Sequence, residues 1–282
     1  MIKAIHKIIC GYFKLDGGAM FGVVPKTMWS KQNPPDENDM CSWALRCLLI
    51  ETDEKLILVD TGMGNKQDEK FRSFFHPHGE QSLISSLAKK GFTADDITDV
   101  FLTHLHFDHC GGAVIRNENG ELVPAFSKAK YWSNPRHWEW AMKPNERERA
   151  SFLKENFVPL MDHGVLHFIE NDKATLEWLP GIDIRFVYGH TEAMMLPEID
   201  FENRTYIYCA DLFPSSFHVP MPYIMSYDVR PLVTLQEKEI VLNQAVDHEH
   251  VLVFEHDPFI DAATVIRDDK GKIKVDRAIE LN

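Results

Sequence analysis

The chain has 282 residues, with 43 acidic and 30 basic side chains, a formal charge of −13 and 14 histidines. Hydrophobic residues make up 44% and charged residues 26%, which are ordinary globular values and exclude a fibrous or largely disordered chain. The negative charge argues against nonspecific binding to nucleic acid or to an anionic membrane, because both need a basic face.

Membrane and targeting signals are weak in this sequence. Lys3, His6 and Lys7 interrupt the first apolar stretch, and no later run approaches the roughly 18 apolar residues that span a bilayer. The five cysteines are odd in number and lack C-x-x-C spacing, which is typical of a reducing compartment. We therefore expect a soluble, cytoplasmic protein in which each cysteine is a small buried apolar group.

In the first part of the chain, a loop is predicted over 30–39, where Asn, Pro and Asp are concentrated. The apolar runs 45–51 and 55–59 are separated by three polar residues and predict a β-hairpin. A helix is predicted over 81–90, where apolar residues recur at helical spacing, and a short capped helix over 93–96.

In the rest of the chain, strands and helices alternate. A solvated helix is predicted over 145–156 from the spacing of Glu and Arg, and an amphipathic helix over 232–246. The predicted strands are 100–102, 165–169, 182–188, 205–209 and 251–254. This order predicts a mixed α/β fold with layered sheets, and the absence of a linker or repeat favours a single domain over residues 1–282.

The most informative segment carries the pattern H-x-H-x-D-H, formed by His104, His106, Asp108 and His109. If the first two histidines lie at a strand end, alternation directs both side chains to the same side. The following glycine pair at 111–112 lets the backbone turn sharply. Imidazole and carboxylate together are the ligand set of zinc, and of iron or manganese where carboxylates contribute, so the segment predicts a metal site.

This segment resembles the signature of the metallo-β-lactamase superfamily. Four other segments fit that family in the same order: Leu58–Gly62, Tyr188–Thr191, Ala210–Asp211 and Phe254–Asp257. The resemblance extends over residues 44–257 and implies a four-layer αββα fold.

The resemblance also implies a site for two divalent ions, with zinc expected and iron or manganese as alternatives. One ion would be held by His104, His106 and His190, the second by Asp108, His109 and His256, and Asp211 would bridge them. Asp108 would also act as the catalytic carboxylate, which orients a hydroxide or transfers its proton.

A narrower resemblance lies near the N-terminus. Residues Leu15–Lys26, followed by Trp29–Lys31, are similar to the N-acyl-homoserine lactonases, the quorum-quenching branch of the superfamily. That branch implies the opening of a lactone or related ester by a hydroxide that bridges two metal ions. The residues expected to contact the substrate are Met20, Phe21, Phe107, His218 and Tyr223.

One position departs from the pattern of that branch. Several of its members have a tyrosine three residues after the bridging aspartate, where it contacts the substrate carbonyl, but this chain has Pro214. His218, Tyr223 and Tyr227 are the alternative donors in the same region, and the sequence does not choose among them.

Other functions remain open at this point. They are an organophosphate or thioester hydrolase of the same fold, a β-lactamase, and a noncatalytic or redox dimetal protein. The expected partner is a small molecule with an ester or lactone carbonyl, without nucleic acid or membrane, and a homodimer stays open.

Overall fold

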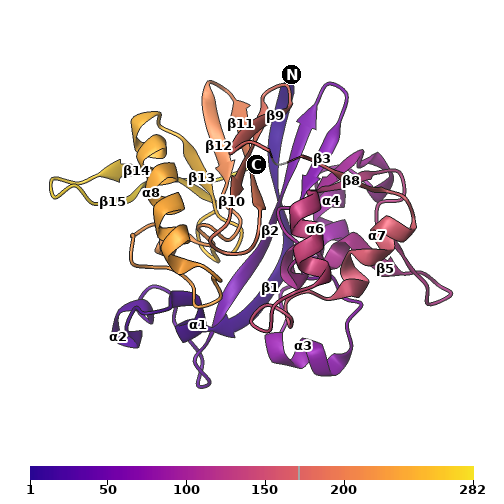
Figure 1. Cartoon of the computed structure of the whole chain (residues 1–282), viewed down its shortest axis with the longest axis horizontal. Coiled ribbons are helices and arrows are strands. Elements are labelled where there is room, and N and C mark those ends of the chain that lie inside the picture. The colour runs from indigo at the N-terminus through magenta and orange to yellow at the C-terminus, as the bar shows by residue number, and fades with distance from the viewer. Residues whose placement is uncertain (171) are drawn as a thin grey trace.

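A computed structural model describes residues 1–170 and 172–282, and in it two large β-sheets pack face to face (Figure 1). The six-stranded sheet has the order β1 (Ile2–Asp16), β2 (Met40–Thr52), β3 (Leu56–Val59), β4 (Asp99–Phe101), β7 (Lys130–Ser133) and β8 (Leu166–Phe168). The seven-stranded sheet has the order β15 (Ile273–Ile279), β14 (Ala262–Arg267), β13 (Val251–Val253), β12 (Arg204–Tyr208), β11 (Met194–Phe201), β10 (Ile182–Val187) and β9 (Thr175–Leu179). A small ribbon pairs β5 (Val114–Arg116) with β6 (Leu122–Pro124).

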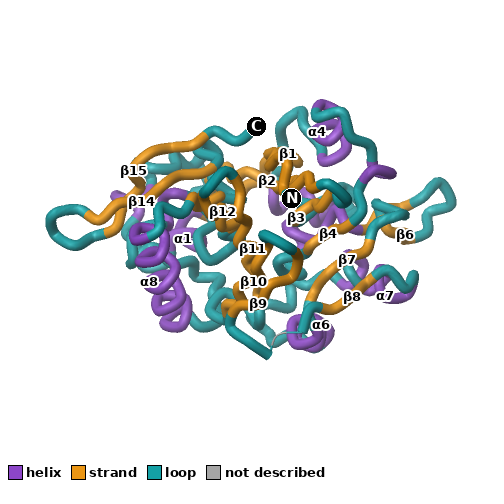
Figure 2. The backbone as a smooth tube through the Cα atoms, turned by 90° about the horizontal axis from the view of Figure 1, so that it is seen from above, coloured by secondary structure: helices purple, strands orange, loops and turns teal. Residues whose placement is uncertain are grey.

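The helices are short apart from one. They are α1 (Gly17–Phe21), α2 (Lys26–Trp29), α3 (Glu69–Phe75), α4 (Leu83–Lys89), α5 (Phe107–Cys110), α6 (Pro135–Met142), α7 (Val158–Asp162) and α8 (Pro231–Asp247). Seen from above, α8 lies against one sheet, whereas α4, α6 and α7 lie beside the other (Figure 2).

The alternation of side chains along the strands explains this layering. On β2, Leu48 and Ile50 enter the core between the two sheets, whereas Cys47 and Leu49 enter a second core beneath α4, α6 and α7. On the far side, Val241 of α8 is buried with residues of the second sheet. The predicted four-layer αββα fold is therefore confirmed.

Most predicted elements are confirmed with small shifts at their ends. The hairpin predicted over 45–51 and 55–59 is the antiparallel pair β2 and β3. The helix predicted over 232–246 is α8, and the one predicted over 81–90 is α4, whose first turn is closed by a capping box at Ser82.

The solvated helix predicted over 145–156 is wrong. Residues 145–151 form turns, in which the side-chain oxygen of Asn145 accepts hydrogen bonds from the backbone N–H groups of Arg147 and Glu148. Glu148 and Phe152 are buried. A local Asn-backbone motif and burial of two side chains thus override the helical spacing of the charges.

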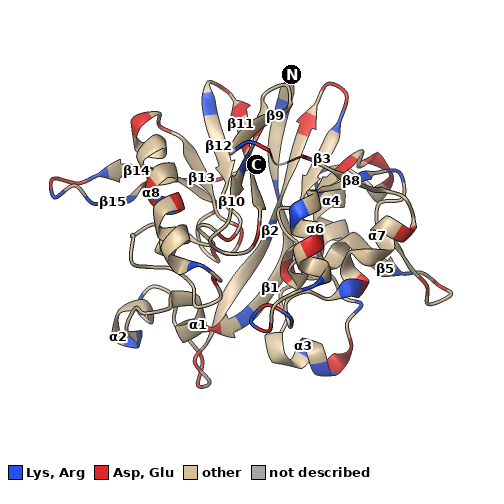
Figure 3. Cartoon of the chain, in the orientation of Figure 1, with Lys and Arg blue, Asp and Glu red and all other residues tan. Residues whose placement is uncertain are grey.

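Charged side chains are spread over the whole fold. Lys and Arg are interspersed with Asp and Glu along the helices, loops and strand ends (Figure 3). Within the described residues, none of the helices has both the length and the hydropathy required to cross a membrane.

Candidate metal centre

The H-x-H-x-D-H segment follows β4 directly. Because β3 and β4 are parallel neighbours, the loops that follow them lie at the same edge of the sheet. Asp60, which follows β3 with a φ of 59°, accepts hydrogen bonds from the backbone N–H (2.8 Å) and the hydroxyl (2.7 Å) of Thr103. This carboxylate therefore fixes the chain immediately before His104 and His106.

Two glycines, Gly111 and Gly112, let the turn after α5 pack closely against the loop that follows β3. A Cβ atom on Gly111 would lie 2.0 Å from the carbonyl oxygen of Met63, and one on Gly112 would lie 2.3 Å from that of Thr61. The one-turn helix α5 carries Asp108 and His109. Its C-terminal end can lie this close to the backbone after β3 only because the two glycines have no side chains.

Gly111→Ala is expected to destabilise the fold by about 1–3 kcal/mol, because its φ of −61° suits alanine but its Cβ collides with backbone. Urea unfolding of the metal-free protein measures this loss. Gly18→Ala is the control, since Gly18 also lies outside the positive-φ region and its added Cβ would meet a side-chain oxygen, that of Asp16 at 3.1 Å, rather than backbone. An equal loss in both variants would contradict the steric explanation.

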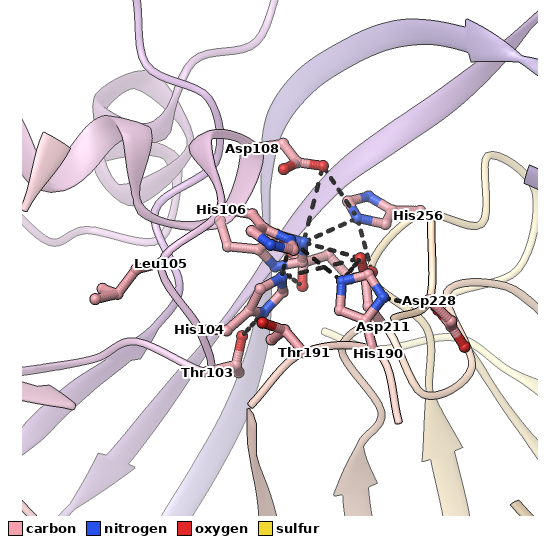
Figure 4. Close-up of polar contacts among 12 residues, drawn as sticks. Thr103, His104, Leu105, His106, Asp108, His190, Thr191, Asp211, Asp228 and His256 are labelled. Atoms are coloured by element: carbon pink, nitrogen blue, oxygen red, sulfur yellow. Dashed lines mark hydrogen bonds and ion pairs between the residues drawn. The ribbon is translucent and has the colours of Figure 1, made fainter. Parts of the chain in front are cut away.

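The remaining candidate ligands come from the second sheet. His190 lies just beyond β10, Asp211 beyond β12 and His256 beyond β13. Figure 4 shows their side chains directed toward those of His104 and His106. Two sheets thus contribute side chains to one cluster at their common edge.

The first group in this cluster has four members. Nε2 of His104 lies 3.1 Å from Nδ1 of His106, which lies 3.2 Å from Nε2 of His190. Oδ2 of Asp211 lies 3.1 Å from the same His190 nitrogen. Ligand atoms about 2.0–2.1 Å from a tetrahedral zinc are about 3.3 Å apart, so this spacing fits a single ion.

The second group contains Asp108, His109 and His256. The Nε2 atoms of the two histidines lie 3.3 Å apart, and Oδ2 of Asp108 is 3.8 Å from the first and 3.7 Å from the second. Asp211 also reaches this group, because its Oδ1 lies 3.2 Å from Nε2 of His256. One carboxylate therefore stands between the two groups.

The cluster suits positive charge. Oδ1 of Asp211 is buried and has no hydrogen-bond partner among the described residues, which is costly unless a cation meets it. Burial lowers the pKa values of His104 and His106, which leaves their rings neutral with a free lone pair. Burial opposes protonation of His256 as well, but Asp211 and Glu255 outweigh it and raise its pKa to about 9.

Four of the five histidines are held from behind through the other ring nitrogen, which fixes the tautomer that faces the cluster. Four Nδ1 atoms have such partners: His104 with the Thr103 hydroxyl (3.1 Å), His190 with Asp228 (2.9 Å), His256 with the Ala44 carbonyl (2.8 Å), and His109 with Asp60 (3.1 Å) and Glu255 (2.9 Å). With Nδ1 protonated, each Nε2 lone pair points into the cluster. The residues present therefore fit bound metal.

A cavity of about 210 Å³ opens above the cluster. Its floor includes His106, Asp108, His190, Asp211 and His256. Its apolar wall includes Leu15, Met20, Phe75, Phe107 and Met225. The candidate metal centre is thus accessible to a small molecule with an apolar part.

The sequence model of the metallo-beta-lactamase superfamily matches residues 46–256 of the chain. The chain belongs to this superfamily. A probable metallo-hydrolase of Mycobacterium bovis is 26% identical over 244 residues, covering 76% of each chain. An N-acyl homoserine lactonase of Bacillus thuringiensis is 29% identical over 155 residues, which cover 51% of this chain and 54% of the lactonase.

Solved structures of the superfamily have the same fold. A probable metal-dependent hydrolase from Staphylococcus aureus superposes with a TM-score of 0.86 at 28% identity over 98% of each chain. AidC, a dizinc quorum-quenching lactonase in complex with a homoserine product, superposes with a TM-score of 0.78 at 23% identity over 100% of this chain and 98% of its own. The predicted superfamily and the predicted enzyme class, a metal-dependent hydrolase, are confirmed.

Within this superfamily site, Glu148 is a contributor that sequence reasoning misses. Its Oε1 accepts from the Thr191 hydroxyl (2.5 Å) and lies 3.5 Å from Nε2 of His106. Its Oε2 accepts from the Trp140 indole (2.8 Å) and the Asn145 amide (2.5 Å). Burial alone would raise the pKa of Glu148, but the contacts with His106 and Thr191 outweigh it and lower the pKa to about 2.

Glu148 accepts three hydrogen bonds, from Thr191, Trp140 and Asn145, and its negative charge also faces Nε2 of His106 at 3.5 Å. The carboxylate therefore favours the His106 tautomer with a proton on Nε2, which leaves the Nδ1 lone pair facing the cluster. The segment 145–151 was predicted as a solvated surface, and no signal in the sequence places this glutamate at the site.

The five residues predicted to contact substrate divide into two sets. Met20 and Phe107 line the cavity, whereas Phe21, His218 and Tyr223 are not among its lining residues. Phe21 stacks on His218, with ring centroids 5.1 Å apart. The His218 ring is used internally, because Nε2 donates to the Met20 carbonyl (2.9 Å) and Nδ1 accepts from the Ser215 hydroxyl.

Of the three alternative donors for the vacant position at Pro214, only Tyr227 is among the residues that line the cavity. Its side chain is partly exposed there. Burial, together with Asp16 and Asp108, raises the pKa of Tyr227, so its phenol stays protonated at neutral pH.

Proposed function

We propose that the chain is a dinuclear metal-dependent hydrolase that opens a lactone or a related carboxylic ester. The observation that carries this proposal is the position of Asp211, whose two oxygens face different histidine groups on the floor of a cavity with an apolar wall. In the proposed assignment, His104, His106 and His190 hold one ion, and Asp108, His109 and His256 hold the other, with Asp211 shared.

Two divalent ions would supply a hydroxide nucleophile at neutral pH and polarise the substrate carbonyl. Zinc is the proposed metal, since histidine and carboxylate ligands at this spacing suit it and the AidC structure contains two zinc ions.

The protein side chains have two proposed tasks in the reaction. Asp108 lies on the cavity floor with one oxygen near His109 and His256, where it orients the attacking group and carries a proton to the leaving alkoxide. Tyr227 donates its phenolic hydrogen to the substrate carbonyl oxygen, the task for which Pro214 offers no donor.

The substrate class follows from the walls of the cavity. Phe71 and Phe75 of α3 pack on Phe107 with ring centroids 5.2 and 4.5 Å apart, which makes an aromatic surface beside the metal centre. Such a surface suits an acyl chain. The Bacillus lactonases, at 29% identity, and the homoserine product bound to AidC support an acylated lactone.

The test is a substrate panel on protein with a measured metal content. We expect two zinc ions per chain and hydrolysis of N-acyl-homoserine lactones that is faster than hydrolysis of a thioester, a paraoxon-type ester or a β-lactam. Removal of metal with a chelator should abolish hydrolysis, and added zinc should restore it. Faster hydrolysis of the thioester or the phosphotriester would replace the lactone assignment, and one ion per fully active chain would contradict the dinuclear one.

A further inference from the structure

A pair of thiols lies behind the metal centre, on adjacent strands of the first sheet. The Sγ atoms of Cys10 on β1 and Cys47 on β2 are 3.4 Å apart, within S–H···S hydrogen-bond distance. Cys10 Sγ also lies 3.8 Å from the Ile8 carbonyl oxygen. The thiols of the other three cysteines donate to backbone carbonyls and have no hydrogen-bond contact with another sulfur among the described residues: Cys41 to Asn33, Cys110 to Leu105 and Cys209 to Ile207.

The two thiols differ in solvent accessibility. Cys47 is completely buried, and burial raises its pKa well above the usual value for a thiol. Cys10 is partly exposed and lines a cavity of about 340 Å³, whose wall includes Thr61, Met63 and Gly64. This cavity shares no lining residue with the one above the metal centre, so a small oxidant can reach Cys10 without entering the active site.

The backbone at Cys10 has room to adjust. The pairing of β1 with β2 shifts between Ile9 and Tyr12, so Cys10 and Gly11 together oppose a single residue of β2. Gly11 has a φ of +116°, a conformation that glycine adopts without strain. A disulfide needs its sulfur atoms about 2.05 Å apart, and a bulge beside a glycine can supply the approach of more than 1 Å.

We propose that Cys10 and Cys47 are a redox-active dithiol, a modification site that hydrogen peroxide oxidises to a disulfide. The Cys10 sulfur attacks one peroxide oxygen, an S–O bond forms as the O–O bond breaks, and the departing hydroxide takes the thiol proton to give water. The Cys47 sulfur then attacks the Cys10 sulfur, so that an S–S bond forms and the S–O bond breaks, and a second water leaves with the Cys47 proton. Each sulfur loses one electron, and the peroxide gains two.

The position of the pair connects it to the site. A Cβ atom on Gly62 would lie 2.9 Å from the Cβ of Cys10, so Cys10 packs directly against the turn that begins at Asp60. That turn holds Thr103 and His109 through the Asp60 carboxylate. The disulfide would therefore form next to the turn that positions the metal-binding segment, on the side of the turn that faces away from the metal centre.

The test treats the reduced, full-length protein with hydrogen peroxide and measures its intact mass and its unreduced peptide map. We expect the loss of two hydrogen atoms, a peptide that joins Cys10 to Cys47, and reversal of both by dithiothreitol. In Cys47→Ser, Cys10 should instead accumulate as a sulfenic acid that dimedone traps. In Cys10→Ser, Cys47 should stay reduced because no oxidant reaches it.

The wild-type map decides the proposal even if a variant fails to fold. A Cys10 that stays reduced, a Cys10 oxidised to sulfinic acid without a cross-link, or a disulfide to Cys41, Cys110 or Cys209 would each overturn it. The outcome is independent of the proposed lactonase activity, because no step of this test requires turnover.

Discussion

Asp108→Ala is expected to lower the turnover of the best lactone substrate by about 100- to 10,000-fold, the range that one general acid–base group contributes. Its carboxylate is only 8% exposed and stands on the cavity floor, nearly equidistant from the Nε2 atoms of His109 and His256. In the proposed assignment Asp108 holds one ion through Oδ2, which faces the two histidines, and its other oxygen is left for proton transfer, whereas Asp211 is shared between both ions and Glu148 already accepts three hydrogen bonds. Steady-state kinetics on protein with verified metal content measures the loss.

The matched control is Asp183→Ala, which removes an exposed carboxylate from β10 and should leave both turnover and unfolding unchanged. Thermal unfolding of the metal-free Asp108→Ala protein should remain close to wild type, since the polar contacts of this carboxylate among the described residues are the long ones to His109 and His256, at 3.8 and 3.7 Å. Near-normal turnover of Asp108→Ala with both ions present would contradict the assigned role.

The metal-binding segment could be predicted because its candidate ligands are close together in the sequence. Four candidate ligands stand within six residues, and their spacing alone indicates shared chemistry. His190, Asp211 and His256 each stand alone after an apolar strand, so they were assigned only through the order of segments in the family. The structure brings all of them to one edge of the two sheets.

The partners behind the ligands could not be predicted, because their contacts span long stretches of chain. His190 meets Asp228, which is 38 residues away, and His256 meets the backbone of Ala44, which is 212 residues away. Side-chain periodicity carries no information about such pairs. β1 was not predicted as a strand either, because its 15 residues are mostly half-buried and show no regular alternation of buried and exposed positions.

Substrate contact by Phe21, His218 and Tyr223 stays a prediction, and the structure places these side chains outside the lining of the cavity above the metal centre. An aromatic residue such as Phe21 and a histidine such as His218 look equally suited to a cavity wall and to a packed core. In the structure they stack on each other, and the imidazole closes two internal hydrogen bonds. Tyr227, further along the same region, lines the cavity.

Glu148→Gln is expected to weaken binding of one zinc ion by about 10- to 100-fold, the usual effect of removing a partner of a metal-binding histidine. An amide NH₂ in place of Oε2 would face the Trp140 and Asn145 donors, and one in place of Oε1 would remove the negative charge that lies 3.5 Å from Nε2 of His106. Asn145 cannot simply turn to accept, because its oxygen is already bonded to two backbone N–H groups of the same turn. The His106 ring therefore loses the contact that fixes its tautomer.

Competition with a chromophoric chelator measures the two zinc affinities separately from turnover. We expect the lower affinity at the ion assigned to His104, His106 and His190. The variant should then release one of its two equivalents of zinc at a chelator concentration at which wild type keeps both. Glu146→Gln is the control, because that side chain stands on the same turn but is 82% exposed and pairs with the exposed Arg149. A purely structural role for Glu148 would instead lower the unfolding temperature of the metal-free protein while both zinc affinities stayed equal to those of the control. Two unchanged affinities would therefore refute the assignment of Glu148 as the residue that positions His106.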